Sequence, residues 1–203
     1  MHSDQVRRQL TSRGFAIIAG VSMDAIEALG AELGQVRSGW EILVPQDADN
    51  ARENSLSSRY GRNAFPWHSD GAIARRPPRY LLMYSRMTEP VEPTEILSLT
   101  EDPRTLQAMA RTVLLIKRGS SKRYASALER RSGGFLARWD TRSAPPLRSV
   151  NAGIASSLIE ESPPTGRVDW RYKAGVVIDN HRCLHRRPAI ANSSRTLYRM
   201  YAY

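Results

Sequence analysis

Short apolar runs separated by turn-forming residues dominate the hydrophobic pattern of this sequence. Each run is short enough to be a single strand, and clusters of Pro, Gly and Ser lie between the runs. The runs occupy residues 14–20, 79–84, 94–99, 112–117, 135–139, 175–179 and 195–203. The pattern therefore predicts a protein built mainly of β-strands.

Helical periodicity is confined to a few segments. Residues 4–13 are typical of a short polar helix, and residues 101–111 also have helical character. Ser22 can cap a further helix that ends near Gly34 and whose apolar positions recur every three or four residues: Met23, Ile26, Leu29 and Leu33. Many short strands with a few helices beside them predict a mainly β, α+β architecture of the β-sandwich or jelly-roll type.

The length of 203 residues suits one domain spanning 1–203. The polar segment 45–64 contains few apolar residues, and 118–148 is rich in Arg and Ser with Gly133-Gly134 inside it. We expect both segments to be loops or lids over a site.

Composition narrows the class of protein. Hydrophobic residues make up 41% of the chain, which is enough for a packed core. The single cysteine, Cys183, excludes an intramolecular disulfide and favours a reducing cytoplasm. We expect neither a signal peptide nor a membrane-spanning segment. The net charge of +10 makes an anionic partner plausible, without deciding between a small molecule and a nucleic acid.

Two separate segments offer metal ligands. His68 and Asp70 are two positions apart, so on a strand their side chains would leave from the same face. Far along the chain, an apolar strand runs into Asp179-Asn180, and His185 follows. Two histidines and one carboxylate on one face of a metal are typical of non-haem iron(II) oxygenases. His181 is a competing ligand candidate, because it lies four residues before His185.

At these motifs the sequence resembles the taurine dioxygenase-like (TauD/TfdA, clavaminate synthase-like) family of iron(II)- and 2-oxoglutarate-dependent dioxygenases. The matching pieces are WHSDGA with PPRYLLMY after it, EPT ending at Thr94, DNHRCLHRR and SRTLYR. The spacings of 26 residues from His68 to Thr94 and ten from His185 to Arg195 are also similar to those of the family. The resemblance implies a double-stranded β-helix (jelly roll, cupin-like fold).

The resemblance also implies a set of site residues. Iron(II) would be bound by His68, Asp70 and His185, and the distal carboxylate of 2-oxoglutarate by Thr94 and Arg195. A guanidinium suits that task because it can bind a carboxylate with two parallel hydrogen bonds. Arg199 is a candidate for an anionic group of the substrate, with a structural ion pair as the alternative.

The expected activity is oxidation, most simply hydroxylation, of a C–H bond in a small anionic metabolite of amino-acid, nucleotide or carrier-bound type. Dioxygen and 2-oxoglutarate would be consumed, and succinate and CO₂ released. Asp70 provides a carboxylate where halogenating relatives bind halide, so hydroxylation is preferred over halogenation. Cys183 is expected to be a buried hydrophobe, and Trp67 and Trp139 are expected to pack in the core or at its rim.

Three alternatives remain. One is a basic nucleic-acid-binding protein, prompted by the net charge and by a basic helix expected in KRGSSKRYASALERR at 117–131. Another is an oxygenase that acts on methylated nucleic acid, as the AlkB-like enzymes do, although SRTLYR does not match their arginine spacing. The third is a jelly-roll binding protein without catalytic activity.

Overall fold

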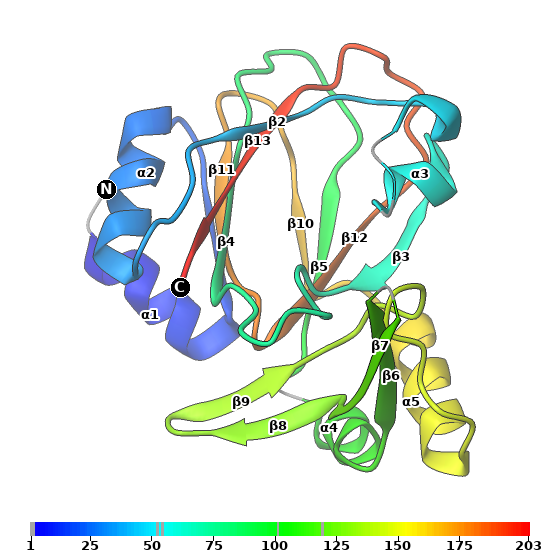
Figure 1. The fold of residues 1–203 in the computed structure, drawn as a ribbon. Coiled ribbons are helices and arrows are strands. Elements are labelled where there is room, and N and C mark those ends of the chain that lie inside the picture. The colour runs from blue at the N-terminus through cyan, green and yellow to red at the C-terminus, as the bar shows by residue number, and fades with distance from the viewer. Residues whose placement is uncertain (1–2, 52, 54, 101, 119) are drawn as a thin grey trace.

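The protein is described by a computed structural model, which covers residues 3–51, 53, 55–100, 102–118 and 120–203. Its centre consists of two antiparallel sheets (Figure 1). The five-stranded sheet has the order β1-β11-β4-β13-β2, with bounds Phe15–Ile18, Gly175–Asp179, Tyr80–Tyr84, Leu197–Ala202 and Glu41–Leu43. The four-stranded sheet has the order β10-β5-β12-β3, with bounds Gly166–Val168, Thr94–Ser98, Cys183–Arg187 and Phe65–His68.

The inner faces of these sheets share an apolar core. Side chains alternate between the two faces of a strand, so every second residue of each strand can point inward. The buried cluster accordingly combines residues of both sheets, among them Phe15, Leu81 and Ile178 from the larger and Ile96 and Cys183 from the smaller. The metal-ligand candidates lie in and beside strands of this layered structure.

Two N-terminal helices cover the outer face of the five-stranded sheet (Figure 1). They are α1 (Ser3–Arg13) and α2 (Met23–Leu33). The Ser22 side chain accepts a hydrogen bond from the amide of Ala25 and caps α2, as predicted. Gly175 permits the close contact of α2 with β11, because a Cβ there would lie 2.6 Å from the Cδ1 atom of Ile26.

Residues between β5 and β10 cover the outer face of the four-stranded sheet. Helices α4 (Pro103–Ala110) and α5 (Val150–Glu161) pack there with strands β6 (Val113–Arg118), β7 (Ser121–Ser126), β8 (Leu128–Arg131) and β9 (Gly134–Ala137). Buried Trp67 and Leu184, from the sheet, share a cluster with Met109, Leu114 and Ile159. Apolar packing therefore joins this part of the chain to the rest.

The expectation of a loop over 118–148 is wrong for its first half, since β7 and β8 lie within it in addition to β9, which the apolar run 135–139 predicted. Hairpin β8–β9 forms because Gly133 and Gly134 adopt φ values of 81° and 150°, which glycine reaches without steric cost. The basic run 117–131 is likewise extended in β6, β7 and β8 and not helical as expected, because β6 and β7 pair along their whole lengths. The segment 45–64 contains a 3₁₀ turn, η1 (Ala48–Asn50), and one helical turn, α3 (Ser57–Tyr60).

The other predicted elements are confirmed within two residues at their ends. The helices at 4–13 and 101–111 correspond to α1 and α4, and the strand at 175–179 to β11. Helix α5 was not predicted from the sequence. Among the described residues, no helix combines the length and the apolar character that crossing a membrane requires.

Candidate metal centre

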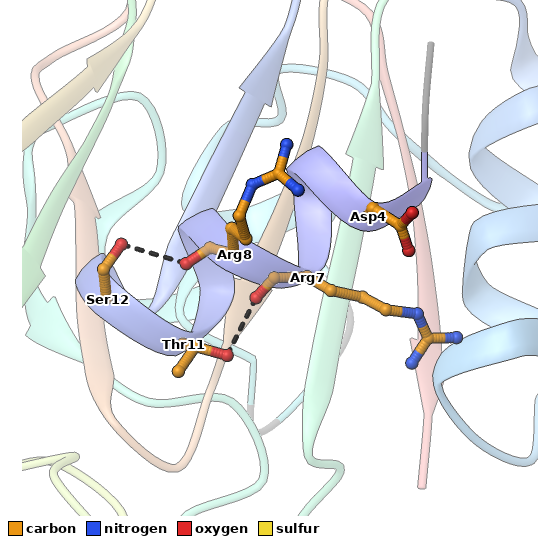
Figure 2. Close-up of a pocket in the computed structure, with 5 residues that line it drawn as sticks. All are labelled: Asp4, Arg7, Arg8, Thr11 and Ser12. Atoms are coloured by element: carbon orange, nitrogen blue, oxygen red, sulfur yellow. Dashed lines mark hydrogen bonds between the residues drawn. The ribbon is translucent and has the colours of Figure 1, made fainter.

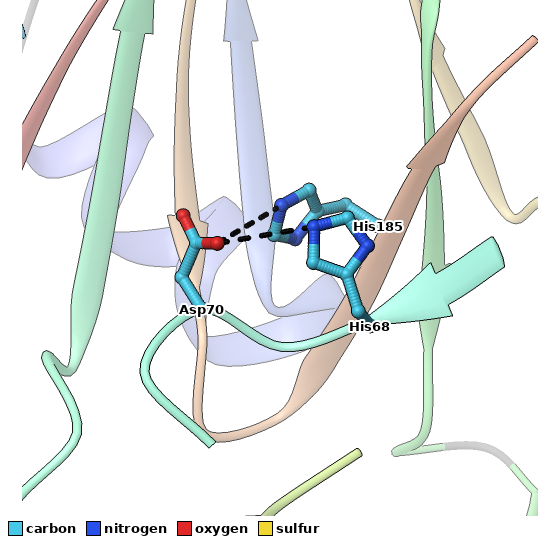
Figure 3. Close-up of side chains that lie close together, drawn as sticks. All are labelled: His68, Asp70 and His185. Atoms are coloured by element: carbon cyan, nitrogen blue, oxygen red, sulfur yellow. Dashed lines mark ion pairs between the residues drawn. The ribbon is translucent and has the colours of Figure 1, made fainter. Parts of the chain in front are cut away.

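The structure brings His68, Asp70 and His185 together between the two sheets (Figure 3). His68 is the last residue of β3 and lies directly opposite His185 of β12, so the two imidazoles share one face of the strand pair. Their ring centroids are 4.2 Å apart. Asp70, however, lies beyond the end of β3, so the same-face argument from the sequence does not apply to it.

The distances among the three side chains suit a shared cation. The Nε2 atoms of His68 and His185 each lie 3.8 Å from Oδ1 of Asp70, too far for a hydrogen bond. Ligand atoms that share one metal ion at about 2.0–2.2 Å are roughly 3–4 Å from one another. One ligand atom from each residue lies within 4.8 Å of the others, and all three residues are buried. The donor set and its spacing therefore fit one divalent metal ion.

The protonation of the histidines also fits metal binding. Burial, reinforced by His68, lowers the pKa of His185 to about 3, so its imidazole is neutral at pH 7 and has a free lone pair. Nδ1 of His68 lies 2.9 Å from the carbonyl oxygen of Pro66, a contact that requires a proton on Nδ1 and leaves the lone pair of Nε2 free for a metal ion. Nδ1 of His185 is buried and has no partner in the described part of the chain.

The two carboxylate oxygens of Asp70 have different surroundings. Oδ1 faces the histidines, whereas Oδ2 accepts a hydrogen bond of 2.8 Å from the Tyr201 hydroxyl and one of 3.3 Å from Nη1 of Arg199. Burial alone would raise the pKa of Asp70, but Arg199, the histidines and Tyr201 outweigh it and hold the pKa well below its ordinary value. Asp70 is therefore a carboxylate at neutral pH.

The main chain around Asp70 is fixed by two other segments. Its amide donates to Oδ1 of Asn180 at 2.8 Å, and Nδ2 of Asn180 donates to its carbonyl oxygen at 2.9 Å. The preceding residue, Ser69, donates its amide to the carbonyl oxygen of Trp139 at 2.8 Å and accepts from the Trp139 amide at 3.0 Å through Oγ. These contacts place Asp70 although it lies outside a strand.

Arg138 holds the loop that follows Asp70. Its guanidinium, 1% exposed, donates to the carbonyl oxygens of Ala72, Ala74 and Arg75 and pairs with Glu129 at 2.9 Å. The segment 118–148 therefore supports the metal-ligand loop directly.

Arg195 is a buried arginine whose fork has free donors. Its Nε donates to the carbonyl oxygen of Glu92 at 3.0 Å, and neither Nη1 nor Nη2 has a protein partner among the described residues. Burial lowers the pKa of Arg195 to about 10 despite the opposing effect of Glu92, so the side chain remains charged at pH 7. Thr94, two residues after Glu92, accepts a hydrogen bond from Trp170 through Oγ1, which leaves the hydroxyl proton available to a ligand.

Arg199 is engaged with two carboxylates. Besides its contact with Asp70, it donates to Oε2 of Glu41 from Nη2 at 2.7 Å and from Nε at 3.2 Å. Glu41 lies directly opposite Arg199 on the short edge strand β2, with half of its side chain exposed. The structural ion pair foreseen as the alternative role of Arg199 is therefore present.

Other candidate residues lie outside this cluster. His181 is half-buried, with Nε2 3.4 Å from the carbonyl oxygen of Pro77, and does not belong to the metal-ligand group. Cys183 is fully buried, and burial raises the pKa of its thiol to about 12. Trp67 and Trp139 are buried in the apolar cluster beneath α4 and α5, as predicted.

A separate hollow lies along α1 and is lined by Asp4, Arg7, Arg8, Thr11 and Ser12 (Figure 2). The two hydroxyls donate to carbonyl oxygens of their own helix, Thr11 to Arg7 and Ser12 to Arg8. Arg7 also lies 3.5 Å from the Glu32 carboxylate. The hollow therefore lacks the buried polar groups of a built site.

Tyr201, Asn180 and Glu41 were not proposed as site residues from the sequence. Tyr201 was detectable in principle, because it lies two positions after Arg199 on a predicted strand and so shares its face. Glu41 carried no such signal, since its cross-strand pairing with Arg199 joins residues 158 positions apart.

The two-sheet architecture is that of iron- and 2-oxoglutarate-dependent oxygenases of known structure. PvcB from Pseudomonas aeruginosa is 19% identical, with a TM-score of 0.67 over 100% of this chain and 80% of PvcB. PvcB is described as an iron- and alpha-ketoglutarate-dependent oxygenase from an isonitrile synthetic pathway. No protein-family model matches the sequence, and a search of curated proteins finds no significant match.

Two further structures share this fold. Asparagine oxygenase, in complex with Fe(II), 3-hydroxyasparagine and succinate, is 12% identical, with a TM-score of 0.73 over 98% of this chain and 77% of its own. The non-haem iron oxygenase OrfP, in complex with iron, succinate and hydroxyarginine, is 17% identical, with a TM-score of 0.71 over 99% and 79%. At these identities the likeness concerns the fold: antiparallel sheets with a few helices beside them.

Proposed function

We propose that this chain is an iron(II)- and 2-oxoglutarate-dependent dioxygenase of the TauD/TfdA-like family, with a double-stranded β-helix fold. The observation that carries the proposal is the buried cluster of His68, Asp70 and His185, with Oδ1 of Asp70 3.8 Å from both Nε2 atoms. A two-histidine, one-carboxylate set is the characteristic ligand group of non-haem iron(II) oxygenases. The shared fold of three such oxygenases supports the same reading.

In this proposal His68, Asp70 and His185 hold iron(II). The bound metal supplies redox chemistry that couples oxidative decarboxylation of 2-oxoglutarate to insertion of oxygen into a substrate C–H bond. One atom of dioxygen enters succinate, the other enters the alcohol product, and CO₂ leaves. The protein keeps the ligands in place and excludes water, with the three side-chain ligands 6%, 8% and 7% exposed in chain order.

We infer that Arg195 and Thr94 bind the distal carboxylate of 2-oxoglutarate. Arg195 combines burial, positive charge and two terminal nitrogens that have no protein partner among the described residues. Arg187, also buried, is a useful contrast, because its terminal nitrogens already donate to carbonyl oxygens including those of Gly61 and Asn63. Only Arg195 of this pair offers a free fork to a carboxylate.

We propose a small substrate that carries a carboxylate, and favour an amino acid because the complexes of asparagine oxygenase and OrfP contain hydroxylated amino acids. Arg199 remains the candidate for the substrate carboxylate. Glu41 occupies part of its guanidinium, so an anionic group has to share or displace that contact. The half-exposed Glu41 side chain on a three-residue edge strand makes such an exchange feasible.

The carboxylate of Asp70 favours hydroxylation over halogenation. We propose that 1–203 forms one catalytic domain, located in the cytoplasm, with 45–64 and 118–148 bordering the site. A hydrogen bond from Arg142 to the carbonyl oxygen of Ser55 joins these two segments and supports their common role.

An anaerobic titration tests the function. Iron(II) and 2-oxoglutarate are added to the purified protein, and the visible charge-transfer band of the chelate is followed. We expect a band in the wild type, none in His68→Ala, and a much higher 2-oxoglutarate requirement in Arg195→Ala. No band in the wild type, or a band unchanged in both variants, would contradict the proposal. A screen of amino acids for stimulated succinate release then identifies the substrate.

A further inference from the structure

The two oxygens of Asp70 are divided between the metal-ligand cluster and the five-stranded sheet. Oδ1 is equidistant from the two histidine Nε2 atoms, at 3.8 Å. Oδ2 is turned away from them and receives the hydroxyl of Tyr201 at 2.8 Å. A carboxylate oxygen held in this way by a neutral donor is a weaker competitor for the metal.

From this division we propose that Tyr201 is a positioning residue that restricts Asp70 to binding the metal through Oδ1 alone. The inference rests on the proposed function. An octahedral ion bound by two histidines and one carboxylate oxygen retains three free positions, which 2-oxoglutarate and dioxygen require together. Binding through both oxygens of Asp70 would remove one of them.

Tyr201 is held firmly enough for this role. It lies within β13, directly opposite Leu81 of β4 in the interior of the five-stranded sheet. A tyrosine side chain has only two carbon torsions that must be fixed, and the guanidinium of Arg199 lies 5.2 Å from the ring centroid. The hydroxyl therefore approaches Oδ2 from a defined direction.

Arg199 also donates a hydrogen bond to Oδ2 of Asp70, but it is shared between Asp70 and Glu41. Its Nη1 lies 3.3 Å from Oδ2, compared with 2.8 Å for the Tyr201 hydroxyl, and its remaining donors are turned to Glu41. Any movement of Arg199 toward a substrate leaves the hydrogen bond from Tyr201 as the contact that still holds Oδ2. Tyr201 therefore keeps Asp70 in place while Arg199 exchanges partners.

The test compares Tyr201→Phe with the matched variant Tyr198→Phe. Both residues lie on β13, but Tyr198 packs on the outer face with Tyr84 and makes no contact with the metal ligands. Manganese(II) affinity is measured by electron paramagnetic resonance without 2-oxoglutarate. The anaerobic charge-transfer band is then recorded at saturating iron(II) and 2-oxoglutarate, with circular dichroism to verify folding.

Loss of the hydroxyl that orients Asp70 should change the Kd for manganese(II) by about 10-fold or more in Tyr201→Phe. At saturating iron(II) the charge-transfer band should shift or weaken, because Asp70 becomes free to bind through both oxygens. Tyr198→Phe should match the wild type in both measurements.

An unchanged band in folded Tyr201→Phe at saturating iron(II) would overturn the inference, whatever the manganese(II) affinity. An equal change of the band in Tyr198→Phe would also overturn the inference, since the change would then arise from a disturbed β13 and not from the hydrogen bond to Asp70. If the wild-type protein itself shows no band, the failure lies in the proposed function and is thereby distinguished from a failure of Tyr201.

Discussion

Asn180 and Asp70, 110 residues apart in the sequence, exchange two hydrogen bonds through the side-chain amide of one and the main chain of the other. Asn180 also donates to the carbonyl oxygen of Pro78 at 2.9 Å. It is 1% exposed, so no solvent replaces these contacts. The Asp70 carboxylate is therefore positioned from the turn that joins β11 to β12, the strand that carries His185.

We predict that Asn180→Ala both destabilises the protein and weakens metal binding. Three main-chain groups lose their partner, and the free energy of unfolding should fall by about 2–4 kcal/mol. The manganese(II) affinity should fall at least roughly 10-fold. Urea denaturation and metal titration check these values, with Asn151→Ala in α5 as the control. Unchanged stability and affinity in Asn180→Ala would refute the role assigned to it.

Arg195→Lys and Arg195→Ala should separate 2-oxoglutarate binding from metal binding. Lysine retains the charge but not the planar fork, so we expect Arg195→Lys to bind 2-oxoglutarate more weakly than the wild type. In Arg195→Ala the affinity for 2-oxoglutarate should fall by about 100-fold or more. Manganese(II) affinity should stay at the wild-type value. Isothermal titration with 2-oxoglutarate under metal-saturated, anaerobic conditions measures the effect. Arg167, an exposed arginine paired with Glu95, provides the control substitution Arg167→Ala.

Arg138→Ala should destabilise the fold more than any exposed arginine substitution. The change leaves Glu129 and the three carbonyl oxygens of the loop after Asp70 without their buried cation. A loss of roughly 3–5 kcal/mol in the free energy of unfolding is expected. Arg130, exposed on β8, supplies the comparison, because Arg130→Ala should change stability by less than about 0.5 kcal/mol. Equal effects of the two substitutions would contradict the supporting role of Arg138.

The Cys183 thiol should resist alkylation in the folded protein. Burial raises its pKa to about 12, so only about one thiol in 10⁴ is ionised at pH 8, and the sulfur is inaccessible. The thiolate is the reactive form, so labelling of the folded protein should follow ionisation of the thiol. Ionisation becomes substantial only as the pH approaches the pKa of about 12. Iodoacetamide followed by mass spectrometry at pH 8 should show slow labelling in buffer and rapid labelling in urea. Rapid labelling of the folded protein would show that Cys183 is exposed by local opening.

The sequence by itself determined much of the secondary structure and the ligand candidates. Apolar runs such as 175–179 are long enough to be strands and too short for most helices, and Ser22 marks the start of α2. The residue types in HSD and DNHRCLH determined which chemistry was possible. The sequence does not predict helix α5, because its Gly153 and its small Ala and Ser residues give a weak apolar pattern.

Only the tertiary structure decided how these residues meet. The local pattern suggested that a strand would orient Asp70, whereas long-range hydrogen bonds from Asn180 and through Ser69 and Trp139 do so. The tertiary structure also decided that Arg199 is paired with Glu41, whereas the terminal nitrogens of Arg195 have no partner among the residues that the structure describes. The sequence specifies which groups are available, but pairing between strands far apart in the chain decides which charges are neutralised, because that pairing depends on packing of the whole core.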